Sequence, residues 1–141
     1  MACMMLLACA HAWTNFQFQS EYDMLEYMRD EDHNVYVVFF YNSEQDTPAK
    51  LERMKQIVIL ERNLIKTNVL DQFENIVYAE LDLAKGAYEE AAHTIGIDVD
   101  ATLEYPTIVV VDDGVGKWVH GPNSVQLVVP IVRALVERNK Q

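Results

Sequence analysis

Seven consecutive apolar residues, Val35–Tyr41, constrain the fold of this chain more than any other part of its sequence. The run is β-branched and aromatic throughout, and no polar residue interrupts it. Such a run is typical of a strand that is buried on both faces of a sheet. Since crossover helices are what cover both faces of a sheet, we expect an α/β domain with this strand at its centre.

Shorter patterns on either side predict an alternation of strands and helices. Further strands are expected over 13–18, 76–81, 107–111 and 117–120, and helices over 20–30, 49–73, 87–94 and 124–138. Thr47 and Pro48 are suited to the cap and first turn of the long helix, while Pro130 should kink the last helix or delay its start. The order predicts a central mixed sheet of parallel strands and a C-terminal hairpin, with helices on both faces.

The charge of the chain excludes some classes of partner. Eleven Lys and Arg residues face 22 Asp and Glu residues, for a formal net charge of −11. A surface of this sign repels phosphate backbones and anionic lipid headgroups. We therefore expect other protein subunits as partners, and neither nucleic acid nor a membrane surface.

Residues 1–12 form an apolar segment ahead of the domain expected over 13–141. The segment is too short to span a bilayer, and no Lys or Arg precedes its apolar run, so we expect an uncleaved docking arm. The alternative is a signal peptide, because Ala10-His11-Ala12 resembles a cleavage site. The candidate interface residues of the arm are Met4, Met5, Leu6, Leu7 and Trp13.

No motif for a metal or a cofactor occurs in the sequence. Cys3 and Cys9 have the spacing of neither a C-x-x-C pair nor a zinc knuckle, and we expect buried or interface thiols there. The four histidines are isolated, and Asp112-Asp113-Gly114 lacks the ligand pattern of a calcium loop. We expect neither a metal nor a cofactor, and a reactive thiol at either cysteine is the less favoured alternative.

Three local patterns together resemble the thioredoxin family. The segment 38–41 is similar to the strand end before the redox loop of protein disulfide isomerase domains, 76–82 to the family's third strand, and 107–121 to its hairpin. Tyr105-Pro106-Thr107 stands where the family has a cis-proline. The resemblance implies a thioredoxin fold and a cis Tyr105–Pro106 bond.

The redox residues of the family are replaced by other residues in this sequence. A gap-free alignment from Val38 places the two redox cysteines on Gln45 and Pro48, and the preceding tryptophan on Glu44. The buried carboxylate that assists the chemistry falls on Phe39. Because only a thiolate attacks a disulfide, the resemblance implies a redox-inactive member rather than an enzyme.

Two hypotheses about function follow. The first is a non-catalytic accessory subunit of a larger protein assembly, in a mitochondrial membrane complex or a cytoplasmic or ciliary one. The alternative is a luminal binding module, similar to the non-catalytic domains of protein disulfide isomerases or to calsequestrin, from which the signal peptide has been cleaved. The state of the N-terminus separates the two.

Overall fold

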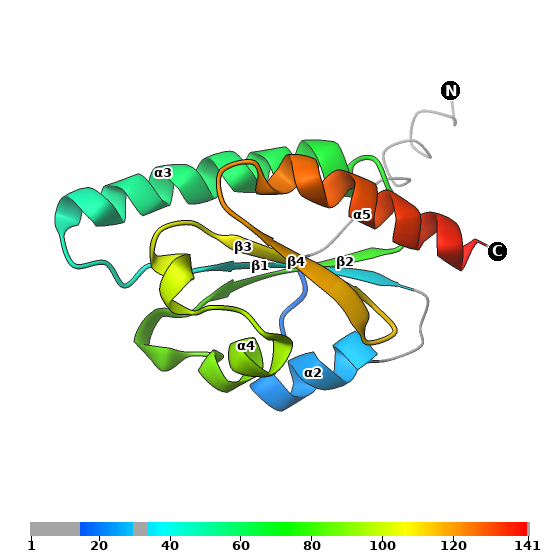
Figure 1. Ribbon diagram of the computed structural model, residues 1–141, viewed down its shortest axis with the longest axis horizontal. Coiled ribbons are helices and arrows are strands. Elements are labelled where there is room, and N and C mark those ends of the chain that lie inside the picture. Colours follow the sequence, from blue (N-terminus) through cyan, green and yellow to red (C-terminus); the bar gives the residue numbers. More distant parts are fainter. Residues whose placement is uncertain (1–14, 30–33, 141) are drawn as a thin grey trace, which may run out of the picture.

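The computed structural model describes residues 15–29 and 34–140. Cys3, Cys9 and the candidate interface residues of the N-terminal segment lie outside these ranges. Four strands form one sheet in the order β2-β1-β3-β4 (Figure 1). The strands are β1 (Val35–Tyr41), β2 (Ile76–Asp82), β3 (Thr107–Asp112) and β4 (Val115–His120).

The sheet is mixed, as the sequence predicted. β1 is parallel to β2 and antiparallel to β3, and β3 and β4 form an antiparallel hairpin. The expected strand over 13–18 is wrong for the part that the structure describes, where it is reduced to one parallel bridge between Asn15 and Tyr78. The rings of Phe16 and Phe18 contact instead the ring of Tyr27, which lies in helix α2 (Glu21–Arg29), with edge-to-face and tilted geometry respectively.

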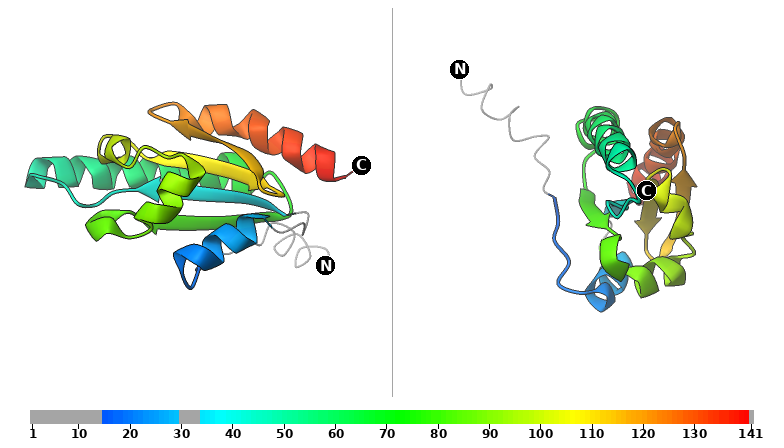
Figure 2. Two further views of the ribbon diagram at one scale, coloured as in Figure 1. Left: turned by 60° about the horizontal axis from the view of Figure 1, so that its bottom comes forward. Right: turned by 90° about the vertical axis from the view of Figure 1, so that its left-hand side faces the viewer.

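Helices cover both faces of the sheet (Figures 1 and 2). α3 (Pro48–Ile65) and α5 (Ser124–Asn139) lie on one face, and α2 (Glu21–Arg29) and α4 (Glu89–Ile95) lie on the other. The alternation of side chains along β1 supplies two cores: Val37 and Phe39 face α3 and α5, while Val38 and Phe40 face α2 and α4. All four side chains are fully buried, which explains why the run in β1 contains no polar residue.

The sequence pattern over 49–73 also predicts an interruption between Asn63 and Asn68, and the α-helix does end at Ile65, followed by a π-helical turn over Lys66–Leu70. The alternative that Pro130 delays the start of the last helix is wrong, because α5 begins at Ser124 and continues through Pro130. Pro130 has no N–H, so one carbonyl group in the preceding turn of the helix has no helical partner. Because Pro130 is exposed, this carbonyl lies near solvent.

Candidate functional site

The loop 42–47 joins the end of β1 to the start of α3 and holds the positions that align with the redox cysteines. Thr47 has an extended backbone (φ −134°, ψ 154°), and its Oγ1 accepts a hydrogen bond from the N–H of Lys50 at 3.2 Å. Pro48 occupies the first turn of the helix, where no N–H is needed. The prediction that Thr47 caps this helix is confirmed. Pro48 therefore has a local structural reason to be present.

Two buried or half-buried polar side chains shape the loop. Asn42, which is 5% exposed, accepts the N–H of Glu44 at its Oδ1 at 2.9 Å. Asp82, the last residue of β2, accepts the N–H of Ser43 and the N–H of Ala84, both at 3.0 Å. The hydroxyl of Ser43 also donates to Asp82, at 2.5 Å. The loop is thereby fixed to the end of the neighbouring parallel strand.

Gln45 connects this loop to a second one across the end of the sheet. Its Nε2 donates to the carbonyl of Asn42 at 2.8 Å and to the carbonyl of Leu103 at 3.2 Å. The neighbouring Glu44 accepts the N–H of Lys85 at 2.8 Å. The amide of Gln45 therefore satisfies main-chain acceptors of two loops that are far apart in sequence, which is a structural role for this position.

A polar groove of about 320 Å³ lies beside Gln45. Its lining residues are Glu44, Gln45, Asp46, Lys50, Arg53, Asp100, Leu103 and Glu104. Arg53 donates to the carbonyl of Glu104 at 3.3 Å, and its guanidinium lies 5.2 Å from the centre of the Tyr105 ring. Both basic side chains of the groove thus have neighbours, since Lys50 pairs with Asp46 at 3.5 Å.

The expected cis bond before Pro106 is wrong: the Tyr105–Pro106 peptide is trans, and no cis bond occurs among the described residues. The trans form is the lower-energy isomer of an X–Pro bond. Pro106 itself is buried directly before β3. Next to it, the Thr107 hydroxyl and His120 Nδ1 are 3.0 Å apart across the hairpin. The position of Pro106 at the start of β3 agrees with the sequence pattern, and its peptide geometry does not.

The place that aligns with the assisting carboxylate is apolar. Phe39 is fully buried in the core between the sheet and the α3 and α5 layer. Glu80, which pairs with Phe39 across the β1–β2 ladder, is already engaged: Arg62 contacts both of its Oε atoms, at 2.7 and 2.8 Å. The Tyr78 hydroxyl donates to the same carboxylate at 2.7 Å. This network is structural, and sequence patterns alone did not reveal it.

The surroundings of the Tyr78 and Tyr41 hydroxyls keep both groups protonated. Burial raises the pKa of Tyr78, and the hydrogen bond to Glu80 raises it further. Burial also raises the pKa of Tyr41, with a further contribution from the charge of Asp82. Both hydroxyls therefore remain neutral at physiological pH, which is the form that can donate to a carboxylate.

Two kinds of feature are not found among the described residues: a cluster that could hold a metal ion and a helix that could span a membrane. In the ranges 15–29 and 34–140, no group of three or more His, Cys, Asp or Glu side chains is arranged to hold a metal ion. No helix within the same ranges has the length and apolar character that a membrane crossing requires. His93 lies 3.6 Å from Glu89 on the surface of α4, a pairing of neighbours one helical turn apart.

Comparison with solved structures identifies the fold as that of thioredoxin. A thioredoxin from Trypanosoma brucei brucei superposes with a TM-score of 0.57 at 14% identity, over 92% of this chain and 96% of that one. A thioredoxin from Fasciola hepatica superposes with a TM-score of 0.51 at 21% identity, over 85% and 94% of the two chains. No family model and no curated protein sequence matches the chain. At these identities the likeness concerns the fold.

Proposed function

We propose that this chain is a non-catalytic thioredoxin-like protein that serves as an accessory subunit of a larger protein assembly. The observation that carries the proposal is the position of Gln45. Its side-chain amide donates to the main chain of two loops, the loop 42–47 before α3 and the loop that contains Leu103 before β3. From residue 10 onward the sequence contains no cysteine, so none of the described residues at this end of the sheet carries a thiol.

The chemistry of disulfide exchange supports this proposal. The reaction begins with a thiolate attacking a sulfur atom, and neither an amide nor a pyrrolidine ring is a substitute. The hydroxyl of Ser43 donates a hydrogen bond to Asp82. Among the described residues, no histidine hydrogen-bonds to Ser43 or Asp82, so neither has a histidine base. The hydrogen bonds hold the loop 42–47 in one conformation, and its side chains offer no nucleophile for disulfide exchange.

A role in binding other proteins accounts for two features that a catalytic role would not explain: the groove beside Gln45 and the apolar N-terminal segment. We propose that the surface around the groove beside Gln45 and the apolar segment with Met4, Met5, Leu6, Leu7 and Trp13 contact other protein subunits. A mitochondrial membrane complex or a cytoplasmic or ciliary assembly would supply such subunits. The acidic luminal binding module remains the second candidate, because Ala10-His11-Ala12 has the form of a cleavage site.

The absence of redox activity is tested by reduction of insulin with dithiothreitol. We expect the rate with the protein to equal the uncatalysed rate. The double variant Gln45→Cys and Pro48→Cys should form a disulfide across the first turn of α3 and gain measurable exchange. A rate above the uncatalysed one with the unaltered protein would contradict the proposal, and loss of that activity on replacing Cys3 and Cys9 by serine would assign it to those thiols.

The accessory role is tested on protein from its native source. Native electrophoresis followed by mass spectrometry should find the chain in a complex well above its own 16.2 kDa. The same mass spectra report the N-terminus: Met1 or Ala2 as the first residue supports the docking arm, and Trp13 as the first residue supports the luminal module. Migration as a monomer without stable partners is the result that would refute the assembly role.

A further inference from the structure

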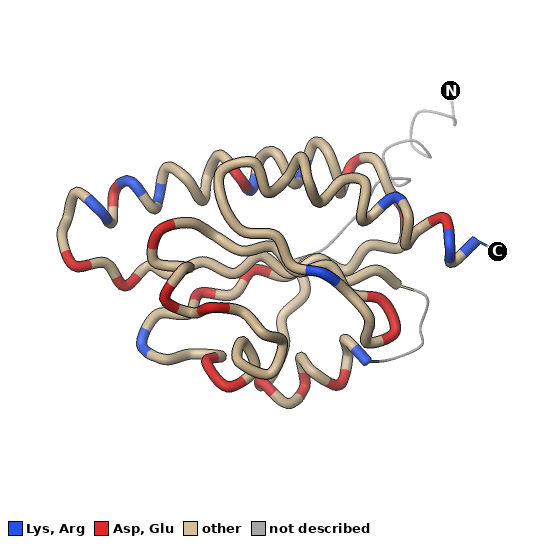
Figure 3. The backbone as a smooth tube through the Cα atoms, viewed as in Figure 1, with Lys and Arg blue, Asp and Glu red and all other residues tan. Residues whose placement is uncertain are grey.

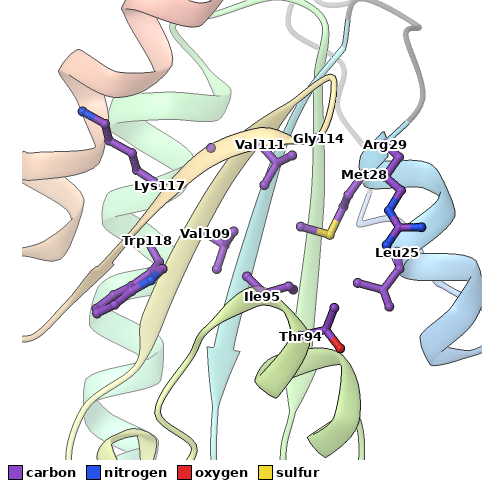
Figure 4. A pocket seen from close by; sticks show the side chains of 11 residues that line it. Leu25, Met28, Arg29, Thr94, Ile95, Val109, Val111, Gly114, Lys117 and Trp118 are labelled. Atoms are coloured by element: carbon purple, nitrogen blue, oxygen red, sulfur yellow. The ribbon is translucent and has the colours of Figure 1, made fainter.

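A groove on the face of the hairpin toward α2 and α4 lies apart from the loop 42–47. It is bounded by β4, α2 and α4 and has a volume of about 260 Å³ (Figure 4). Apolar side chains form its floor and walls: Leu25 and Met28 of α2, Ile95 of α4, Val109 and Val111 of β3, and Trp118 of β4. Trp118 is 49% exposed, so a large aromatic surface faces solvent at the rim.

Gly116 keeps this groove open. It pairs with Val111, so a side chain there would lie on the groove side of the sheet. A Cβ atom at this position would overlap the carbonyl oxygen of Val110. The close approach of the two strands therefore requires glycine, and as a result no side chain covers the apolar surface between Trp118 and the turn.

The main chain of β4 borders the groove with open hydrogen-bonding groups. β4 is an edge strand of the described sheet. The turn residues Asp113 and Gly114 both have positive φ, 53° and 73°, as in a two-residue type I′ hairpin. Asp112 and Val115 are then a hydrogen-bonded pair, and alternation makes Lys117 and Val119 the next such residues on β4.

The same alternation directs the N–H and C=O groups of Gly116 and Trp118 away from β3, toward the free edge. A molecule that satisfies both pairs must itself carry alternating N–H and C=O groups, as an extended peptide does. A peptide residue paired with Gly116 also places its side chain on the groove side, because directly paired residues share a face of the sheet.

Charge at the groove is opposite to that of the chain as a whole. Its lining contains the cation Arg29 and no acidic residue, although acidic residues dominate α2 and α4 (Figure 3). Lys117 also borders the groove, but its side chain points away from it, because Lys117 pairs with Val110, which belongs to the core on the other face of the sheet (Figure 4). Arg29 stands at the turn end, where its Cα and Cγ lie 3.8 Å from the Cβ position of Gly114. Among the described residues, Arg29 has no acidic partner.

We propose that β4 and this groove bind an extended segment of a partner protein by adding it to the sheet as a further strand. An apolar residue of the segment pairs with Gly116 and enters the groove, and a carboxylate two residues away, toward the turn, pairs with Arg29. A second copy of this chain fits less well, because two molecules of net charge −11 repel each other. Residues 1–14 carry no carboxylate side chain and lack the acidic feature.

A fluorescein-labelled heptapeptide of sequence TVTLTDT tests the proposal with the full chain. Paired antiparallel, its leucine lies opposite Gly116 and its aspartate reaches toward Arg29. Fluorescence anisotropy should show saturable binding. We expect about a tenfold loss of affinity on replacing the aspartate by asparagine, and a similar loss with the variant Arg29→Glu. Arg133→Glu, a matched change on the opposite helical layer, should bind as the unaltered protein does.

Methylated peptides distinguish strand addition from simple apolar contact. An N-methyl group on the leucine removes the donor that faces β4 and should abolish binding, whereas an N-methyl group on a neighbouring threonine points away and should leave it. Equal effects of the two methyl groups, or no binding at 1 mM peptide, would overturn the proposal. So would a concentration-dependent dimer in sedimentation equilibrium that the peptide does not dissociate, because a second copy would then occupy the edge.

Discussion

Replacing Arg138 by methionine is expected to lower the free energy of unfolding by about 2 kcal/mol, less than for a fully buried ion pair because the arginine is half exposed. Asp112, at the end of β3, is completely buried, and Arg138 Nη2 of α5 lies 2.9 Å from its Oδ2. The other carboxylate oxygen has no hydrogen-bond partner among the described residues. Methionine would keep the volume of the side chain but would leave a buried charge without its cation. Urea unfolding followed by circular dichroism measures the change.

Two further variants assign the cause of that loss. Arg133→Met changes an exposed arginine of the same helix that has no ion pair among the described residues, and it should change stability by less than about 0.5 kcal/mol. Adding Asp112→Asn to the Arg138→Met variant should recover part of the loss, because the stranded charge is removed. If Arg138→Met is no worse than Arg133→Met, water reaches the carboxylate and the ion pair contributes little.

Replacing Glu61 by methionine should have the opposite sign and stabilise the protein at neutral pH, by about 1 to 2 kcal/mol. Glu61 lies on the buried stripe of α3 with Val58 and Ile65 and is only 3% exposed. Its Oε2 has no hydrogen-bond partner among the described residues. Burial raises the pKa of this carboxyl above its ordinary value of 4.5. Ionising it therefore costs more in the folded chain than in the unfolded chain.

The pH dependence of this effect has a definite direction. A raised folded-state pKa means that the native protein keeps a proton that the unfolded chain loses, so the stability of the unaltered protein falls as the pH rises from 4.5 toward the raised value. The advantage of Glu61→Met should grow over that window and stay constant above it. Glu52→Met, on the exposed face of α3, is the matched control and should show no such dependence. A pH-independent difference for Glu61→Met would show that the carboxyl titrates normally.

Sequence patterns located most of the fold because the relevant signals are local. The apolar run in β1, the Thr47-Pro48 start of α3 and the Asp113-Gly114 turn each specify their element through backbone geometry or periodicity. The expected strand over 13–18 failed for the opposite reason. A few alternating residues favour an extended chain, but only packing determines whether it pairs, and the aromatic rings there pack on α2 instead.

The sequence by itself determined the central strand, the hairpin and the absence of cysteine at positions 45 and 48. Only the tertiary structure decided what Gln45 contacts, that Glu61 and Asp112 are buried, and that Gly116 opens a groove beside a free strand edge. The physical reason is distance along the chain. A cap or a turn depends on neighbours a few residues away, whereas burial and pairing depend on residues that meet only when the sheet has assembled, such as Asp112 and Arg138.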